Sequence, residues 1–264
     1  MKKSPRIMTE SGYTAHMCLI VFDWHPGSEQ WLTLSANRDE VFYRPTRPLQ
    51  PWPQHPGLFA GQDLEKGGTW LGLTDKGRWA ALTNVRVPGA GPQDPRSRGE
   101  LVLNYLTSDL APEAWAEQLD TAEYAPFNLL TGTSDTLCYT TNYPDKASRI
   151  LAPGRYGLSN AQLNTPWPKV RLALQQLAAA PAPEALTTLL SHREPFADNE
   201  LPHTGVSELW ERLLSAQFIR APGYGTRCST GLSIRGHLAR LEEITWNEEG
   251  EAAGQALFTI PLTF

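Results

Sequence analysis

The chain has 264 residues, of which 41% are apolar and 19% charged, and its formal net charge is −5 at pH 7. This size and composition fit a globular protein with a sizeable core. The negative balance argues against a nucleic-acid partner, because phosphate contacts need clustered Lys and Arg. No apolar run reaches the roughly 18 residues of a transmembrane helix. The cysteines, Cys18, Cys138 and Cys228, lack metal-ligand spacing, so we expect no metal site and a cytoplasmic protein with reduced thiols.

The first sixteen residues differ in character from the rest of the chain. They include Lys2, Lys3 and Arg6 but no apolar stretch of the kind found in a secretion signal. The apolar run "MCLIVFDW" begins directly after them. We therefore expect residues 1–16 to be an extension and residues 17–264 to form a single domain.

Two β-hairpins are predicted near the start of the domain. The runs "CLIVFDW" and "WLTLSAN" flank the turn-forming "HPGSEQ". A turn centred between Gly27 and Ser28 places Cys18 opposite Asn37, beside the segment "NRDE" at residues 37–40. Residues 69–74 and 79–84 flank a second turn, which brings "GGT" to the same hairpin end as Asn84.

Helical signals come next along the chain, and strands return at the end. Ser97 and Glu100 have the spacing of a capping box, and Pro112 is expected to begin a second short helix. Thr165 and Pro166 are typical of an N-cap and a first helical residue. Further helices are expected over residues 183–191 and 206–214, before the apolar strands of the C-terminal part. Runs of strands, then helices, then strands predict an α+β fold.

Cys18 has two possible interpretations. Most cysteines are small buried apolar residues. Alternatively, removal of residues 1–17 makes Cys18 the first residue and frees its α-amine, whose reference pKa of about 7.7–8.0 lets it take the thiol proton. A thiolate with a base on the same residue is an N-terminal nucleophile. While Met17 is attached, that nitrogen is an amide and cannot act as the base.

Other polar residues could complete such a site. Arg38 could lower the pKa of the thiol, and Asp39 could hold the amine, although both could also form a solvated ion pair at a strand end. They should point to opposite faces of the strand. Asn84 and Asn160 suit either turn geometry or an oxyanion contact. Arg227, in "PGYGTRCST", could bind a carboxylate or a carbonyl, or could simply follow a glycine turn that leads into a strand.

Taken together, the motifs resemble the NRDE family, also called the transport and Golgi organisation protein 2 family. The resemblance covers Met17 to near Phe264, and the motifs that carry it are "MCLIVF", "LSANRDE", "GGTWLGL", "AALTNVR", "SRGELV", "FNLL", "YGLSNA", "TPWPK" and "PGYGTR". Family members begin at the Met of "MC", so the extension departs from the family pattern.

The family in turn resembles N-terminal-nucleophile hydrolases of the cholylglycine hydrolase group, which implies a four-layer αββα sandwich. The resemblance implies that Cys18 is the nucleophile, with Arg38 and Asp39 beside it. It also implies that Asn84 and Asn160 supply oxyanion contacts and that Arg227 supports the thiolate. The hydrolases space their Arg and Asp apart, whereas Arg38 and Asp39 are adjacent here.

Our leading hypothesis is a hydrolase that uses Cys18 to cleave a linear, non-peptide amide or acyl bond in a small-molecule or lipid-like substrate, without a cofactor. The alternative, also implied by the resemblance, is a non-enzymatic protein that binds and carries haem or a lipid or acyl-CoA. A third possibility is a degenerate hydrolase that serves as an interaction module. The sequence predicts neither the substrate nor the oligomeric state.

Overall fold

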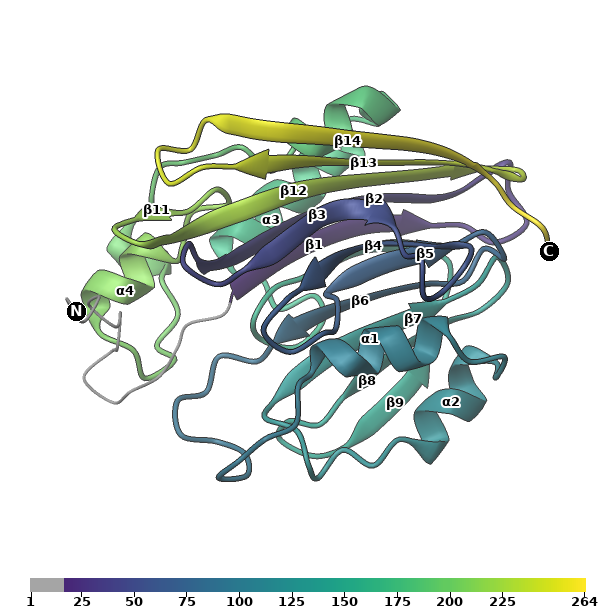
Figure 1. Ribbon diagram of the computed structural model, residues 1–264. Coiled ribbons are helices and arrows are strands. Elements are labelled where there is room, and N and C mark those ends of the chain that lie inside the picture. Colours follow the sequence, from purple (N-terminus) through teal and green to yellow (C-terminus); the bar gives the residue numbers. More distant parts are fainter. Residues whose placement is uncertain (1–16) are drawn as a thin grey trace.

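The computed structural model describes residues 17–264, so the predicted extension over residues 1–16 lies outside the described residues. Within residues 17–264 the strands form two antiparallel sheets of seven strands each (Figure 1). The sheet that we call the β1 sheet has the order β10-β1-β2-β12-β13-β14, with β11 paired to β12. The β6 sheet runs from β3 to β9 in chain order.

The β1 sheet consists of β1 (Met17–Trp24), β2 (Gln30–Val41), β10 (Gly154–Leu158), β11 (Arg220–Ala221), β12 (Tyr224–Arg235), β13 (Leu238–Trp246) and β14 (Ala252–Pro261). The β6 sheet consists of β3 (Thr46–Pro51), β4 (Leu58–Asp63), β5 (Leu71–Thr74), β6 (Trp79–Asn84), β7 (Phe127–Gly132), β8 (Leu137–Thr141) and β9 (Ala147–Ile150). The two predicted hairpins therefore form, as β1–β2 and as β5–β6.

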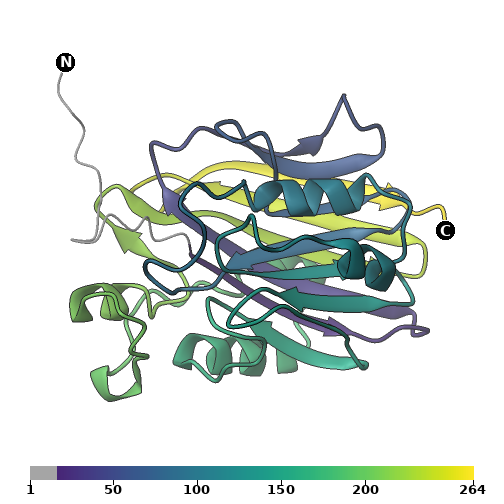
Figure 2. The same cartoon turned by 90° about the horizontal axis from the view of Figure 1, so that it is seen from below.

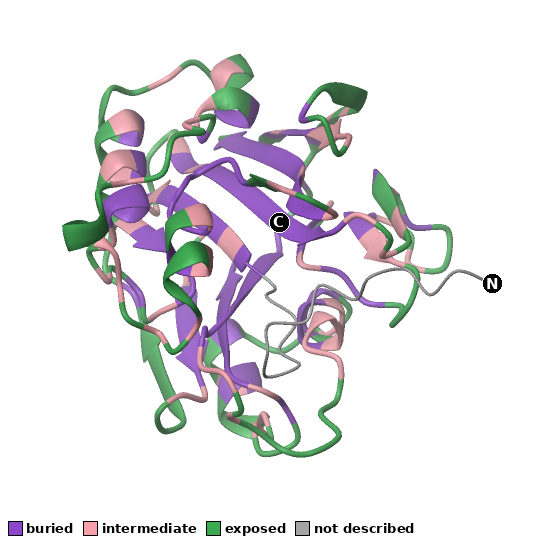
Figure 3. Cartoon of the chain, turned by 90° about the vertical axis from the view of Figure 1, so that its left-hand side faces the viewer, coloured by how far each residue is buried: buried purple, intermediate pink, exposed green. Residues whose placement is uncertain are grey.

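An apolar core fills the space between the two sheets, where the strands are buried (Figure 3). Phe22 and Leu34 from the β1 sheet belong to the same cluster as Trp79 and Leu130 from the β6 sheet. The rings of Phe22 and Trp79 meet edge-on, with their centroids 6.1 Å apart. Side chains alternate along a strand, so the face of β1 that carries Phe22 also carries Cys18 toward the β6 sheet.

Helices pack against both sheets (Figure 2). Tyr105 and Trp115 pack against Leu129 of the β6 sheet. On the other side of the molecule, Leu19 and Val21 of β1 pack against α3 and the 3₁₀ helix η1. The helices are α1 (Gly99–Leu106), α2 (Pro112–Gln118), α3 (Pro168–Ala178), η1 (Pro183–Thr188), η2 (Asp198–Glu200) and α4 (Glu208–Leu213).

This mixture of helices and antiparallel sheets confirms the predicted α+β class. None of the helices in residues 17–264 has both the length and the apolar character that a membrane crossing requires.

The first hairpin differs from its predicted register by one residue. Cys18 lies opposite Arg38, and Asn37 lies opposite Leu19. The turn is centred on Ser28, whose hydroxyl oxygen lies 2.8 Å from the carbonyl oxygen of His25 and 2.7 Å from that of Gln30. The predicted centre between Gly27 and Ser28 was wrong by half a residue, which shifts every pair along the strands by one.

The helix starts also differ from the predictions. The helix expected at Pro166 begins at Pro168, because a residue that precedes proline disfavours helical angles and Trp167 is extended there. The capping box is wrong as well. Arg98 occupies the cap position without a side-chain cap bond, and the carboxylate of Glu100 forms an ion pair with Arg96 at 2.7 Å instead.

Gly68 is a position where the fold near the cavity requires glycine. A methyl group there would lie 2.6 Å from the carbonyl oxygen of Gly99 and 2.8 Å from the amide nitrogen of Glu100, at the start of α1. Backbone atoms cannot move aside without straining the chain, so we expect Gly68→Ala to lower the free energy of unfolding by about 1–3 kcal/mol. Gly254→Ala is the matched control, because nothing lies within 4 Å of that site. Equal thermal midpoints for the two variants would contradict the expectation.

Candidate active site

Three neighbouring strands bring Cys18, Arg38 and Cys228 into one row. Cys18 on β1 lies opposite Arg38 on β2, which lies opposite Cys228 on β12. Residues that face each other across antiparallel strands share a side of the sheet. The predicted neighbourhood of Cys18 and the "NRDE" segment is therefore present, with Arg38 rather than Asn37 as the direct partner.

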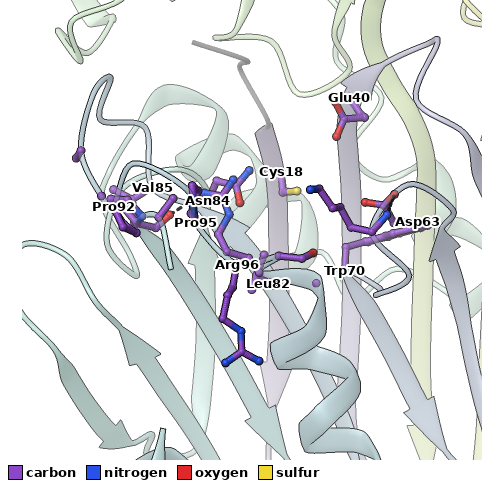
Figure 4. Close-up of a pocket in the computed structure, with 18 of the residues that line it drawn as sticks. Cys18, Glu40, Asp63, Trp70, Leu82, Asn84, Val85, Pro92, Pro95 and Arg96 are labelled. Atoms are coloured by element: carbon purple, nitrogen blue, oxygen red, sulfur yellow. Dashed lines mark hydrogen bonds between the residues drawn. The ribbon is translucent and has the colours of Figure 1, made fainter. Parts of the chain in front are cut away.

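Cys18 lies at a cavity of about 640 Å³ between the ends of the two sheets. Figure 4 shows Cys18 between Asn84 on one side and Trp70 and Asp63 on the other. The loop of residues 85–98, which follows β6 and precedes α1, supplies much of the remaining wall. Charged side chains also line the cavity, and they include Arg38, Glu40, Arg44, Asp63, Lys66, Asp94, Arg96 and Arg98.

Arg38 is held in a fixed position beside Cys18. Its guanidinium lies over the ring of Trp70, 4.6 Å from the centroid, and donates a hydrogen bond of 3.3 Å to Glu40. Only 7% of Arg38 is exposed. A cation stacked on an indole and bonded to a carboxylate has little freedom to move, so its charge acts at one place next to the thiol.

The thiol of Cys18 is not ionised while Met17 is attached. Burial raises the pKa of the Cys18 thiol to about 12, and the negative charge of Asp39 also raises it. The charge of Arg38 lowers this pKa without offsetting the rise. With the peptide bond to Met17 in place, the thiol therefore stays protonated at neutral pH.

Asp39 points to the face of β2 opposite Arg38, as predicted. It is the cross-strand partner of Met17, and its Oδ1 accepts a hydrogen bond of 2.6 Å from the Thr226 hydroxyl. Its Oδ2 is buried and has no hydrogen-bond partner among the described residues. Burial raises the pKa of Asp39 to about 6, while the positive charge of Lys169 lowers it. A carboxylate oxygen without a donor thus lies beside the residue that precedes Cys18.

Asn84 and Asn160 lie together, at the ends of strands from two different sheets. Asn84 ends β6 and lines the cavity. Asn160 follows β10, and its Nδ2 donates a hydrogen bond of 2.9 Å to the carbonyl oxygen of Asn84. The neighbouring Ser159 hydroxyl donates to the carbonyl oxygen of Cys18 at 2.9 Å. Asn160 therefore positions the backbone of Asn84, and the oxyanion role of both side chains stays a prediction.

Arg227 lies at a bulge of β12 and points away from the row of Cys18, Arg38 and Cys228. Its guanidinium donates to the carbonyl oxygens of Val41 at 2.9 Å, Phe42 at 3.3 Å and Arg44 at 3.1 Å. These contacts tie the end of β2 to the segment that leads into β3. Arg227 is not among the described residues that line the cavity.

Lys169 lies near the site, although the sequence did not predict it as a site residue. It is 1% exposed and donates a hydrogen bond of 3.0 Å to the carbonyl oxygen of Leu214. It approaches from α3, on the face of the β1 sheet opposite the cavity. Its motif "TPWPK" belongs to the family pattern, but a lysine at a helix start is typically exposed, and no other signal marked it.

The described residues offer few ligands for a cofactor. No group of three or more His, Cys, Asp or Glu side chains in residues 17–264 is arranged to hold a metal ion. Among the described residues that line the cavity, Cys18 is the one that offers a sulfur and none is a histidine. A haem iron in this cavity would therefore depend on Cys18 as its protein ligand.

Comparison with known proteins agrees with the family resemblance of the motifs. The family model described as Transport and Golgi organisation 2 matches residues 17–248. The chain is 36% identical over 241 residues to the Homo sapiens protein named Transport and Golgi organization protein 2 homolog, covering 81% of this chain and 87% of that protein. The Mus musculus homologue is 33% identical over 259 residues, covering 86% and 92% respectively.

Solved structures of hydrolases and acylases are distantly similar in shape. The Caenorhabditis elegans orthologue of N-acylethanolamine-hydrolyzing acid amidase aligns with a TM-score of 0.48 at 11% identity, over 83% of this chain and 93% of that one. A conjugated bile acid hydrolase from Clostridium perfringens aligns with a TM-score of 0.45 at 9% identity, over 93% and 98%. On the family match and the identity to these relatives, the chain belongs to the Transport and Golgi organisation 2 family.

Proposed function

We propose that the chain, once Cys18 is its first residue, is a cysteine-dependent hydrolase of a linear, non-peptide amide or acyl bond. The two sheets with their packed helices would then be the four-layer αββα sandwich of an N-terminal-nucleophile enzyme. The observation that carries the proposal is the placement of Cys18. Its thiol faces a cavity beside the fixed Arg38. Its nitrogen is bonded to Met17, which lies opposite Asp39 on the neighbouring strand.

The burial of Met17 supports a requirement for processing. Met17 is fully buried in a cluster with Val41, Leu214, Ile219 and Tyr224. It occupies the position opposite Asp39, where partner residues across a strand pair have Cβ atoms roughly 4.5–5.5 Å apart. Removal of Met17 would leave the new α-amine within reach of the unpartnered Oδ2 of Asp39.

The proposed reaction follows from these positions. The α-amine takes the proton of the Cys18 thiol, and the thiolate attacks the carbonyl carbon of the substrate. The side chain of Asn84, at the cavity wall, and a backbone N–H would hold the oxyanion. The ammonium then protonates the leaving nitrogen as the C–N bond breaks. Water hydrolyses the thioester with the same amine as the base, which restores the thiol.

The alternative, a carrier of haem or of a lipid or acyl-CoA, has weaker support. Aromatic and aliphatic side chains fill the space between the sheets, and the cavity at Cys18 is lined with charged groups. An apolar ligand would meet Trp70, Leu82 and Val85 there, but also these charged groups, which it could not pair. A haem titration of the full chain tests this alternative, because a saturable Soret shift that Cys18→Ala abolishes would support the carrier over the hydrolase.

The first prediction concerns the reactivity of the thiol. Near neutral pH, a form that begins at Cys18 should react with iodoacetamide at Cys18 at least about ten-fold faster than a form that retains Met17, because only the former has a base for the thiol proton. Peptide mass spectrometry measures the rates site by site. Cys138 and Cys228 are internal controls, because burial raises the pKa of both thiols. Equal rates at Cys18 in the two forms would disprove the processing requirement.

The second prediction concerns the oxyanion contact. Asn84→Ala in the form that begins at Cys18 should slow acylation by p-nitrophenyl acetate by about 10²–10³-fold, because a donor to the oxyanion is lost. Release of p-nitrophenolate and the acetyl adduct on Cys18 are the readouts. Asn104→Ala, at an exposed position of α1, is the matched control and should leave the rate unchanged. The oxyanion role fails if the two variants acylate at the same rate.

A further inference from the structure

A buried lysine lies behind the candidate active site, on the side away from the cavity. Lys169 is the second residue of α3, and its Nζ donates to the carbonyl oxygen of Leu214 at 3.0 Å. Among the contacts described for residues 17–264, this is the one hydrogen bond of a group that has three donors. A buried ammonium needs opposite charge nearby to remain ionised, so the surrounding charges decide what Lys169 can do.

The charges of four ionisable groups, from β1, β2, α4 and the loop after β6, act on Lys169. Burial and the positive charge of Arg86 lower the pKa of Lys169 to about 8, whereas Asp39, Cys18 and Glu211 raise it. Arg86 forms a buried ion pair of 2.8 Å with Glu211, which largely balances these two charges. Asp39 is then the acidic group whose charge is left to balance Lys169. Among the described contacts, no direct hydrogen bond joins these two residues.

The charge balance changes when Met17 is removed. A new amine then lies beside Asp39, the cross-strand partner of Met17. Lys169 reaches the same region, because it donates to the carbonyl oxygen of Leu214, whose side chain packs in one cluster with Met17. Asp39 alone would stabilise the protonated ammonium and make the amine a poor base, because a carboxylate favours a neighbouring cation. A second cation near the same carboxylate has the opposite effect, since like charges disfavour each other.

We propose that Lys169 is a positioning residue that keeps the α-amine of Cys18 neutral, so that the amine can accept the thiol proton. This inference rests on the proposed function and deepens it. Lys169 and the amine would both interact with the negative charge of Asp39. Asp39 would then orient the amine by a hydrogen bond without raising the pKa of the amine so far that it stays protonated. The same positive charge would favour the thiolate of Cys18 from the helix side, as Arg38 does from the cavity side.

Several ionisable groups besides Lys169 act on Cys18, and a titration must distinguish their effects from the effect of the lysine. Arg38 lies opposite it on β2, the charges of Asp39 and Glu40 on the same strand act on it, and those of Tyr224 and Cys228 on β12 also interact with it. Burial raises the pKa of both Tyr224 and Cys228 well above the ordinary values, so neither titrates near neutral pH. The charge of Lys169 lowers the pKa of Asp39, so Lys169→Met also raises that pKa, and the shift measured for this variant includes any change at Asp39. Lys169→Arg keeps the positive charge and is therefore the reference for both effects.

The test is the pH dependence of iodoacetamide alkylation at Cys18 in the full domain that begins at Cys18. Lys169→Met removes the charge and keeps the chain length, so the midpoint should move up by about one pH unit and the rate near pH 7 should fall about ten-fold. Lys169→Arg keeps the charge, and its midpoint should stay near that of the unmodified protein. A structural role alone would lower the thermal midpoint of Lys169→Met and leave the alkylation midpoint in place, which would overturn the inference.

A second measurement needs no variant at Lys169. The α-carbon resonance of Cys18, followed by NMR with isotope-labelled cysteine, should report an amine that titrates below the ordinary range of about 7.7–8.0. A titration within or above that range overturns the role of Lys169, even if Cys18 is the fastest-reacting cysteine. If Cys18 instead reacts no faster than Cys138 and Cys228, the proposed function itself fails, and the two failures are thus distinguishable.

Discussion

The pairing of Cys18 with Arg38 across β1 and β2 is the constraint on which the candidate site depends. The apolar core fixes this register, because a slip of one residue would turn Phe22 and Leu34 out of the space between the sheets. The same slip would move the thiol away from the stacked Arg38. The energy that keeps a cation beside the thiol therefore comes mostly from the packing of side chains that take no part in chemistry.

The site uses both faces of one sheet. Cys18 and Arg38 face the cavity, whereas Met17 and Asp39 face α3, where Lys169 is buried. Because Cys18 and Met17 face opposite sides of the sheet, the thiol of Cys18 and its backbone nitrogen have different surroundings. The thiol faces the cavity, whereas Met17, which precedes the nitrogen, is buried in a cluster with Leu214 and Tyr224. With Met17 in place, an apolar side chain occupies that cluster and the thiol is protonated.

The sequence predicted the parts of this arrangement that depend on local pattern. Strand-like runs on either side of turn-forming residues predicted both hairpins, and the first hairpin brought Cys18 to the "NRDE" segment. The register was wrong by one residue because the turn is centred on Ser28 and not between Gly27 and Ser28, and residue type alone does not show this. Lys169 was missed because its hydrogen-bond partner, the carbonyl oxygen of Leu214, lies far along the chain. Arg227 was expected at the thiolate, but the bulge of β12 directs it to backbone carbonyls.

The central claim is that Cys18 supplies both the nucleophile and its base. The most direct test is an experimental structure of the form that begins at Cys18, trapped as a covalent acyl adduct. The account predicts a thioester at Sγ, with the α-amine within hydrogen-bond distance of Oδ2 of Asp39 and the acyl oxygen facing Asn84. An adduct on another residue, or an amine turned away from Asp39 toward solvent, would contradict it.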